Sequence, residues 1–306
     1  MNILGILFNF VVFPGFLFSA FVGLLLTWVD RKVTARIHWR VGPKIYQPYA
    51  DFLKLLIKET IVPEGSSRTL FFLGPLLGVI SMSIFAVMIF QMNFDPTSTF
   101  VGDLIVMIYL LAVPAIGIIL GGSASKNPLA SVGASREMTQ AFGYELPFLV
   151  SMAVIVLKAG GTIKFGEIIA VQQSGGPFLY SLSGIIAAVV ILFTIQAKLS
   201  FVPFDIPEAE QEIMAGPYIE YSGVTLAMYK ITRAMMFFLM PLFLVSVLWG
   251  GLTSWWAVLK VLLFVVLIIL IKNTNPRLRI DQALKFFWVG LGLLSIIGLV
   301  LAFYGK

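Results

Sequence analysis

The sequence predicts an all-α, polytopic membrane protein that forms a single integral membrane domain over residues 1–306. Two observations support this fold class. Only 12% of the residues are charged, whereas soluble domains carry about 25%. Hydrophobic residues make up 59% of the chain, and its mean hydropathy is +0.98. Apolar runs of about 20 residues, the length that crosses a bilayer, recur along the chain.

Eight apolar runs are candidate transmembrane helices, and one shorter segment is a candidate amphipathic helix on the cytoplasmic side. The fourth and the sixth run reach a spanning length only if they include charged residues. Their purely apolar parts, residues 146–157 and 234–249, are too short to cross a bilayer. The predicted spans are residues 3–29, 70–92, 104–122, 138–157, 178–197, 225–249, 253–271 and 286–304.

The positions of lysine and arginine predict the orientation of these spans. Eight spans leave residues 30–69, 123–137, 198–233 and 272–285 on one side, and these segments hold 17 of the 21 basic residues. Short loops rich in lysine and arginine stay in the cytoplasm. We therefore expect this side to be cytoplasmic and both termini to lie outside the cell membrane. The net charge of +6 follows from this topology, and no separate basic domain indicates a nucleic-acid partner.

The composition also limits the cofactors. The chain has no cysteine, so it cannot ligate an iron–sulfur cluster through thiolates. His38 is the only histidine, so the chain cannot supply two histidines to a haem. We expect no cofactor and no metal on this chain.

The first predicted loop, residues 30–69, contains a basic segment followed by a short helix. Pro48 suits the start of a helix, and the apolar residues after it fall at helical spacing with charged residues between them. The helix either lies on the membrane surface or supports a docked soluble subunit. The preceding basic residues either face anionic headgroups or bind a soluble partner. They are Arg31, Lys32, Arg36 and Arg40, of which the last three would share a helical face.

Four charged residues fall inside predicted spans, and one of them, Lys260, lies close enough to the outer interface to extend its ammonium group there. Glu145 lies in the cytoplasmic half of the fourth span, and ionisable residues at membrane depth are costly and usually functional. It belongs either to a proton or ion pathway or to an ion pair that fixes helix packing. Lys230 and Arg233 lie in the first turns of the sixth span. They either extend to the cytoplasmic interface or act as counter-charges for the acidic loop before them.

The loop at residues 198–225 concentrates acidic residues. Five of the fifteen acids of the chain fall in its segment FDIPEAEQEIMAGPYIEYSG, residues 204–223. Apolar residues, prolines and glycines between the acids predict a folded, partly buried loop that holds the acids close together. Acids held close together cannot all ionise independently. The cluster either handles protons or pairs with the basic residues of the same face: Asp205, Glu208, Glu210, Glu212 and Glu220.

At these residues the chain resembles a known family. FDIPEAEQEIMAGPYIEYSG is similar to a cytoplasmic loop of the membrane protein, subunit 1, that joins the two arms of respiratory complex I, NADH:quinone oxidoreductase. DRKVTARIHWRVGP and QPYADFLKLLIKE, within residues 30–59, resemble the first loop of the same family. The family also includes a component of energy-converting, membrane-bound nickel–iron hydrogenases and archaeal sulfur reductases. The short spacing between RVGP and QP, and SREMTQA at residues 135–141, are more similar to this hydrogenase branch.

The resemblance implies roles for particular residues. The acids of the loop match a segment near the redox module that leads into a lateral chain of buried charges, and Glu145 matches an acid on the adjacent helix. The redox chemistry is implied to lie on soluble partners, hydrogenase-like large and small subunits with nickel–iron and iron–sulfur centres. Further membrane subunits that translocate ions are also implied. The basic first loop would then be a docking surface.

We expect a non-catalytic membrane subunit that anchors a soluble redox module and couples electron transfer to proton or sodium translocation. The alternative is a subunit that forms a quinone site in a complex I-type NADH or ferredoxin:quinone oxidoreductase. A stand-alone transporter is less favoured, because such folds often contain inverted repeats and this sequence shows none.

Overall fold

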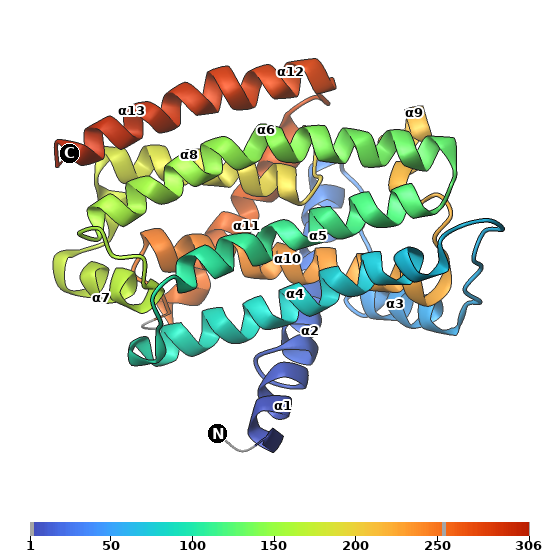
Figure 1. Ribbon diagram of the computed structural model, residues 1–306, viewed down its shortest axis with the longest axis horizontal. Coiled ribbons are helices and arrows are strands. Elements are labelled where there is room, and N and C mark those ends of the chain that lie inside the picture. Colours follow the sequence, from blue (N-terminus) through green and yellow to red (C-terminus); the bar gives the residue numbers. More distant parts are fainter. Residues whose placement is uncertain (1–2, 253–254, 306) are drawn as a thin grey trace.

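The computed structural model describes residues 3–252 and 255–305, and these residues form helices and no strand. Most of the long helices lie along the long axis of the molecule (Figure 1). The most deeply buried of them is α10 (Gly223–Leu248), in which 94% of the most apolar stretch of 18 residues is buried inside the protein. It packs against helices α2 and α4. The other long helices are α2 (Phe16–Ile37), α4 (Arg68–Phe94), α5 (Asp103–Ala124), α6 (Pro128–Lys158), α8 (Leu182–Lys198), α11 (Trp256–Thr274) and α13 (Gly292–Phe303).

Seven stretches of the described residues are helical and apolar enough to cross a membrane. They correspond to seven of the eight predicted spans. The remaining predicted span, residues 178–197, is a 3-10 turn, η2 (Phe178–Tyr180), followed by α8, which has 17 residues and is shorter than the others. The predicted start of the seventh span, residue 253, lies outside the described residues.

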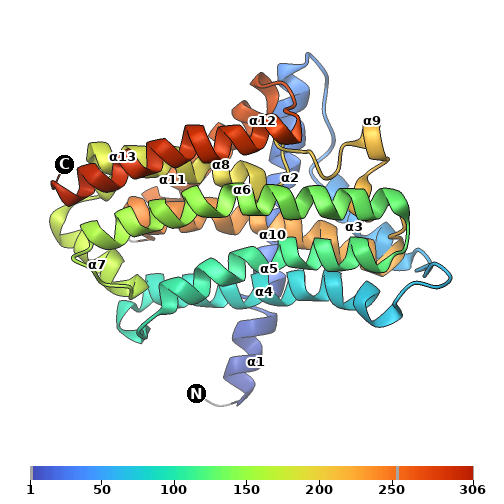
Figure 2. The same ribbon diagram turned by 45° about the horizontal axis from the view of Figure 1, so that its top comes forward.

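The first predicted span is not one continuous helix. It divides into α1 (Ile3–Val11) and α2, and Pro14 lies in the break. Proline has no backbone N–H and disrupts a helix interior, which explains the interruption. Both views show α1 and α2 crossing the other long helices at a steep angle (Figures 1 and 2). The helix α2 also continues beyond the predicted end at residue 29, to Ile37.

The helix α6 begins ten residues before the predicted fourth span. Its N-cap is Asn127, whose side chain accepts a hydrogen bond from the backbone N–H of Leu129 at 2.9 Å, and Pro128 occupies the first turn. The predicted span, residues 138–157, leaves out Glu137. In the structure Glu137 and Glu145 lie on the same helix.

The last span is also longer than predicted. It runs from α12 (Ile280–Lys285) through the π-helical segment η4 (Phe286–Leu291) into α13. This helix packs against α6 and α8. Short helices lie at the two ends of the bundle: α3 (Gln47–Ile57), α9 (Glu210–Ile213) and η3 (Gly216–Tyr218) at one end, and η1 (Pro96–Ser98) and α7 (Phe165–Gly175) at the other. We call the end with α3 and α9 the acidic end.

Candidate functional site

A cavity of about 550 Å³ opens at the acidic end, between α2, α3, α10, the end of α11 and the loop after α8. Its wall includes five acidic and five basic residues. The apolar part of the wall includes Leu24, Phe52 and Phe237. The charged residues are Asp30, Asp51, Asp205, Glu208 and Glu210, and Arg31, Lys230, Arg233, Lys272 and Arg277.

Eight of these ten charges form four ion pairs, so the cavity is lined by pairs of opposite charge. The pairs are Asp30 with Lys272 at 2.7 Å, Asp51 with Arg31 at 2.9 Å, Asp205 with Arg277 at 2.6 Å, and Glu208 with Arg233 at 2.7 Å. Glu210 and Lys230 form no ion pair with any other residue that the structure describes, and both are exposed.

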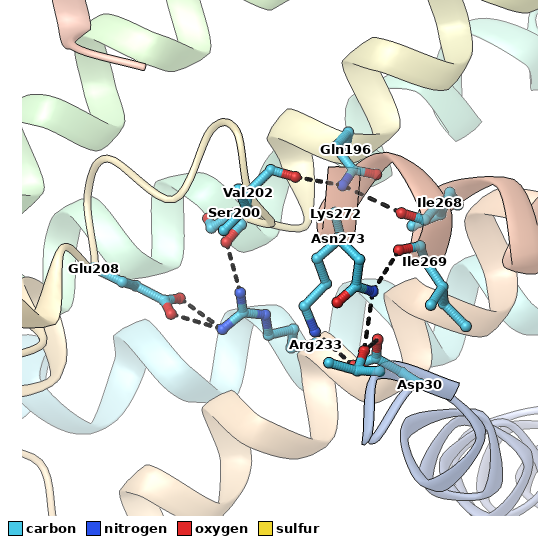
Figure 3. A network of polar contacts seen from close by, with 11 residues as sticks. Asp30, Gln196, Ser200, Val202, Glu208, Arg233, Ile268, Ile269, Lys272 and Asn273 are labelled. Carbon is cyan, nitrogen blue, oxygen red and sulfur yellow. Dashed lines mark hydrogen bonds and ion pairs between the residues drawn. The ribbon is translucent and has the colours of Figure 1, made fainter. Parts of the chain in front are cut away.

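The pair of Glu208 and Arg233 fixes the acidic loop to α10 (Figure 3). One guanidinium nitrogen of Arg233 donates to both carboxylate oxygens of Glu208, at 2.7 and 2.8 Å, and the other donates to the carbonyl of Ser200 at 2.8 Å. The ring of Phe201 lies 5.0 Å from this guanidinium and 4.7 Å from the ammonium of Lys272. The ring thus contributes a cation–π interaction to each of the two cations.

A second link in the same view joins the loop to α8 and α11 (Figure 3). The amide nitrogen of Gln196 donates to the carbonyl of Val202 at 2.7 Å and to that of Ile268 at 3.4 Å. The ammonium of Lys272 reaches across to Asp30 on α2. The walls of the cavity are therefore held by polar contacts between segments that are far apart in the sequence.

The carboxyl groups of this cavity differ in their environment. Burial raises the pKa of Asp205 above its usual value, although Arg277 beside it acts in the opposite direction. The hydrogen bond from Arg31 lowers the pKa of Asp51, which is partly exposed. A proton is therefore accepted more easily by Asp205 than by Asp51.

Glu145 lies apart from this cavity, paired with Lys198 across α6 and α8. The Lys198 side chain is 2% exposed and that of Glu145 is 27% exposed. The ammonium also lies 4.7 Å from the ring centre of Tyr144 and 5.0 Å from that of Phe148. The ion-pair interpretation of Glu145 thus has a specific partner, and an ion pair at this depth is compatible with a pathway as well.

The six acids singled out in the sequence do not gather in one cluster. Glu212 pairs with Arg136 at 2.7 Å, and Glu220 accepts a hydrogen bond from the side chain of Asn127. Glu210 is exposed. Glu208 and Glu212 do not share a helical face, because α9 begins only at Glu210. Four of the six acids, Asp205, Glu208, Glu212 and Glu145, each pair with a different cation.

The first loop also departs from its predicted arrangement. The helix α2 ends at Ile37, so Arg40 does not share a helical face with Lys32 and Arg36. Lys32 donates to the carbonyl of Val41 at 3.0 Å. Arg36 and Arg40 form no ion pair within the described part of the chain, and both side chains are exposed. These two side chains are the ones available to an external partner.

Several charged residues of this region were not selected from the sequence. Asp30, Lys198, Lys272 and Arg277 pair with residues far away in the sequence, and no local pattern indicates such partners. Glu137 is different. It is 1% exposed and lies at helical spacing from Gln140 and Tyr144, which are also buried. A predicted helix that began at Pro128 would have included Glu137 and placed it on one face with Gln140 and Tyr144.

Over residues 3–252 and 255–305, no group of three or more histidine, cysteine, aspartate or glutamate residues is arranged to hold a metal ion. Of the charged groups at the site, the carboxylates can take up protons, and protonation of a carboxylate breaks its ion pair with the neighbouring cation.

Comparison with known proteins identifies the family. The family model described as NADH dehydrogenase matches residues 10–303. The chain belongs to this family. It is 32% identical over 302 residues to the H subunit of the NADH-quinone oxidoreductase of Thermomicrobium roseum, an alignment that covers 89% of this chain and 88% of the relative. It is also 32% identical over 293 residues to the corresponding protein of Geobacillus kaustophilus, with coverage of 89% and 86%.

A solved structure is similar over nearly the whole chain. It is a chain of the membrane-bound sulfane sulfur reductase, an archaeal respiratory membrane complex, with a TM-score of 0.88 and 30% identity. The match covers 97% of this chain and 99% of that one. The resemblance to the complex I family and its archaeal sulfur-reducing relatives is thus confirmed. The chain is a membrane-embedded subunit of the complex I-like type.

Proposed function

We propose that this chain anchors the soluble redox module of an energy-converting oxidoreductase and couples electron transfer to proton or sodium translocation. The observation that carries the proposal is the sequence of charge pairs at the acidic end. The pair of Glu208 and Arg233 borders the open cavity, and the pair of Lys198 and Glu145 lies within the helices. In this proposal a charge change in a docked redox module shifts the protonation of the acidic loop, which in turn biases Glu145.

The topology completes this proposal. We assign α8 as the fifth of eight spans, because 17 helical residues extend about 26 Å, close to the roughly 27–30 Å core of a bilayer. Residues 30–69 then form a basic cytoplasmic loop in which α3 is an amphipathic helix at the interface. Residues 198–225 form the acidic cytoplasmic loop, and both termini lie outside the cell.

The proposed partners follow the hydrogenase branch. They are hydrogenase-like large and small subunits that carry nickel–iron and iron–sulfur centres, together with further ion-translocating membrane subunits. The absence of cysteine from this chain agrees with redox centres on other subunits. The similarity to a chain of an archaeal respiratory complex supports a multi-subunit assembly.

Purification of the native complex in mild detergent tests this assignment. We expect the chain to co-purify with iron-containing soluble subunits. Nickel together with iron would place it in the hydrogenase branch, and iron without nickel would place it with sulfur or quinone reductases. A chain that purifies intact but alone, without metals, would contradict the anchoring role.

A quinone site is the second candidate function, because the cavity of about 550 Å³ combines apolar residues such as Phe52 and Phe237 with charged ones. Reduction of a short-chain quinone by the purified complex, inhibited by a quinone-site inhibitor, would favour it. Reduction of protons or of a sulfane-sulfur compound without quinone reduction would favour the hydrogenase branch.

The basic residues of the first loop give a test of docking. Arg36→Glu combined with Arg40→Glu is expected to weaken association with the soluble subunits by about tenfold or more at low salt, because two cations at the surface become anions. The amount of soluble subunits retained on the immobilised membrane part measures the effect. The matched control replaces Lys158 and Lys164, near the opposite end, with glutamate. It should retain the soluble subunits fully. Equal retention in both double variants would remove this loop from the docking surface.

A further inference from the structure

One face of α6 carries three buried polar side chains at helical spacing, Glu137, Gln140 and Tyr144. They are 1%, 1% and 0% exposed. Each has a buried atom without a hydrogen-bond partner among the described residues: Oε2 of Glu137, Oε1 of Gln140 and the hydroxyl of Tyr144. Native proteins leave few such atoms unsatisfied, so three on one helix face indicate a place where water or a transferred proton is accommodated.

This face lies between the two ion pairs of the site. Its Tyr144 end contacts Lys198, whose ammonium is 4.7 Å from the ring. In the middle, the amide nitrogen of Gln140 donates to the carbonyls of Ala197 and Phe204 at 3.2 and 2.9 Å, which fixes α6 to the end of α8 and to the acidic loop. At the other end, Glu137 interacts electrostatically with three charged residues: Glu208, Arg233 and Lys198.

A small cavity joins the same three charged residues. Its volume is about 20 Å³, which exceeds the roughly 10–15 Å³ that a single water molecule needs. Lys198, Glu208 and Arg233 all line it, and polar atoms of other lining residues offer further hydrogen bonds. The other polar side chains of its wall are Ser200, Tyr218, Tyr229 and Thr232. The cavity is therefore large enough and polar enough to hold a water molecule beside Glu208, Arg233 and Lys198, the three charged residues with which Glu137 interacts.

We propose that Glu137 is a proton-relay residue that connects the pair of Glu208 and Arg233 with the pair of Lys198 and Glu145, through water in this small cavity. The inference deepens the proposed function and rests on it. In the relay a proton leaves the carboxyl group of Glu208 through water and binds the carboxylate of Glu137. It then leaves Glu137 towards Glu145, which regenerates the carboxylate of Glu137.

The charges around Glu137 allow this alternation. Transfer of the proton from Glu208 to Glu137 restores the carboxylate of Glu208, and its ion pair with Arg233 favours the transfer in this direction. Protonation of Glu137 removes an anion that interacts with Lys198, which leaves Glu145 as the remaining partner of that ammonium. Each proton transfer thus changes the charge balance of the next pair along the chain.

A purely structural role explains Glu137 poorly. A buried carboxylate that is retained for packing should have a hydrogen-bonded cation, and Glu137 forms no ion pair within the described residues. Burying such a group costs free energy, so replacement by an apolar side chain of similar volume should be neutral or stabilising. Glu137→Gln and Glu137→Leu are therefore both expected to assemble.

The test uses the intact complex in sealed vesicles. Dithionite-reduced methyl viologen supplies electrons, and the acceptor is whichever the wild-type complex reduces: protons, a sulfane-sulfur compound or a short-chain quinone. A pH-sensitive dye and radioactive sodium report the ions moved per electron. Glu137→Gln and Glu137→Leu are expected to lower this ratio at least about tenfold, as loss of a proton-transfer group does. Glu137→Asp, which keeps the carboxyl group, should restore a measurable ratio.

Two companion variants separate the possible failures. Glu167→Gln removes an exposed carboxylate on α7, at the opposite end, and should match the wild type. Glu145→Gln tests the proposed function itself. If Glu145→Gln lowers the ratio and neither Glu137→Gln nor Glu137→Leu does, the relay is overturned and the proposed function stands. If none of them lowers the ratio, the proposed function falls as well. Failure of both neutral variants to assemble, with Glu137→Asp assembled, would make Glu137 a structural residue and overturn the relay.

Discussion

Glu145→Gln is expected to lower the number of ions moved per electron at least about tenfold, because the amide cannot take up and release a proton as a carboxylate does. The complex should still assemble. The amide oxygen of glutamine can accept the hydrogen bond that the ammonium of Lys198 now donates to Glu145. The measurement is ion uptake by vesicles at a known rate of electron transfer. Unchanged ion uptake in an assembled complex would remove Glu145 from the pathway.

The partner of Glu145 provides the control for stability. Lys198→Met should destabilise the chain, because breaking a buried ion pair leaves an uncompensated charge, at a cost of about 3–5 kcal/mol when both partners are buried. The 27% exposure of Glu145 places the expected cost at or below the lower end of that range. Glu145→Gln combined with Lys198→Met removes both charges and should recover most of the loss. Thermal denaturation of the purified variants distinguishes the double variant from the single one.

The sequence predicted those features that depend on local pattern. Hydropathy located seven of the eight predicted spans, and the period of the apolar residues after Pro48 located α3. The break between α1 and α2 was missed, although Pro14 indicates it, because hydropathy alone does not register a lost backbone donor. The early start of α6 was missed because its first turns are less apolar than a typical span, whereas in the structure Glu137 faces the protein interior.

The sequence predicted which acidic residues belong to the candidate site, but it did not predict which basic residues pair with them. The acids of the loop and Glu145 stand out in an apolar chain, and the family resemblance supports them. Their partners do not stand out, because Lys272 is 242 positions from Asp30 and Lys198 is 53 positions from Glu145. The sequence also suggested that the acids lie close together. Arg233 and Arg136 instead bind Glu208 and Glu212 separately, and a contact of this kind depends on the tertiary fold.

The position of the acidic loop itself depends on one glycine of α6. A Cβ atom added at Gly133 would lie 2.5 Å from Cδ of Pro217 and 2.9 Å from Cα of Gly216, and both of these residues belong to η3 in the loop. Neither is the end of a flexible side chain, so the loop or the helix must move. Overpacking of this kind costs typically about 1–3 kcal/mol.

Gly133→Ala is therefore expected to displace the acidic loop from α6, to lower the thermal stability of the complex and to weaken the ion pairs at Glu208 and Glu212, which precede the contact in the loop. The matched control is Gly290→Ala, also in a helix, where the nearest atom to the new Cβ is 3.8 Å away, on Phe286. Because the position is exposed, this substitution should leave the stability of the protein unchanged or raise it by about 0.5–1 kcal/mol. Thermal denaturation and retention of soluble subunits measure both variants. Equal behaviour of the two would mean that the contact between η3 and α6 does not determine the position of the loop, and the coupling of loop protonation to Glu145 would then need a different structural route.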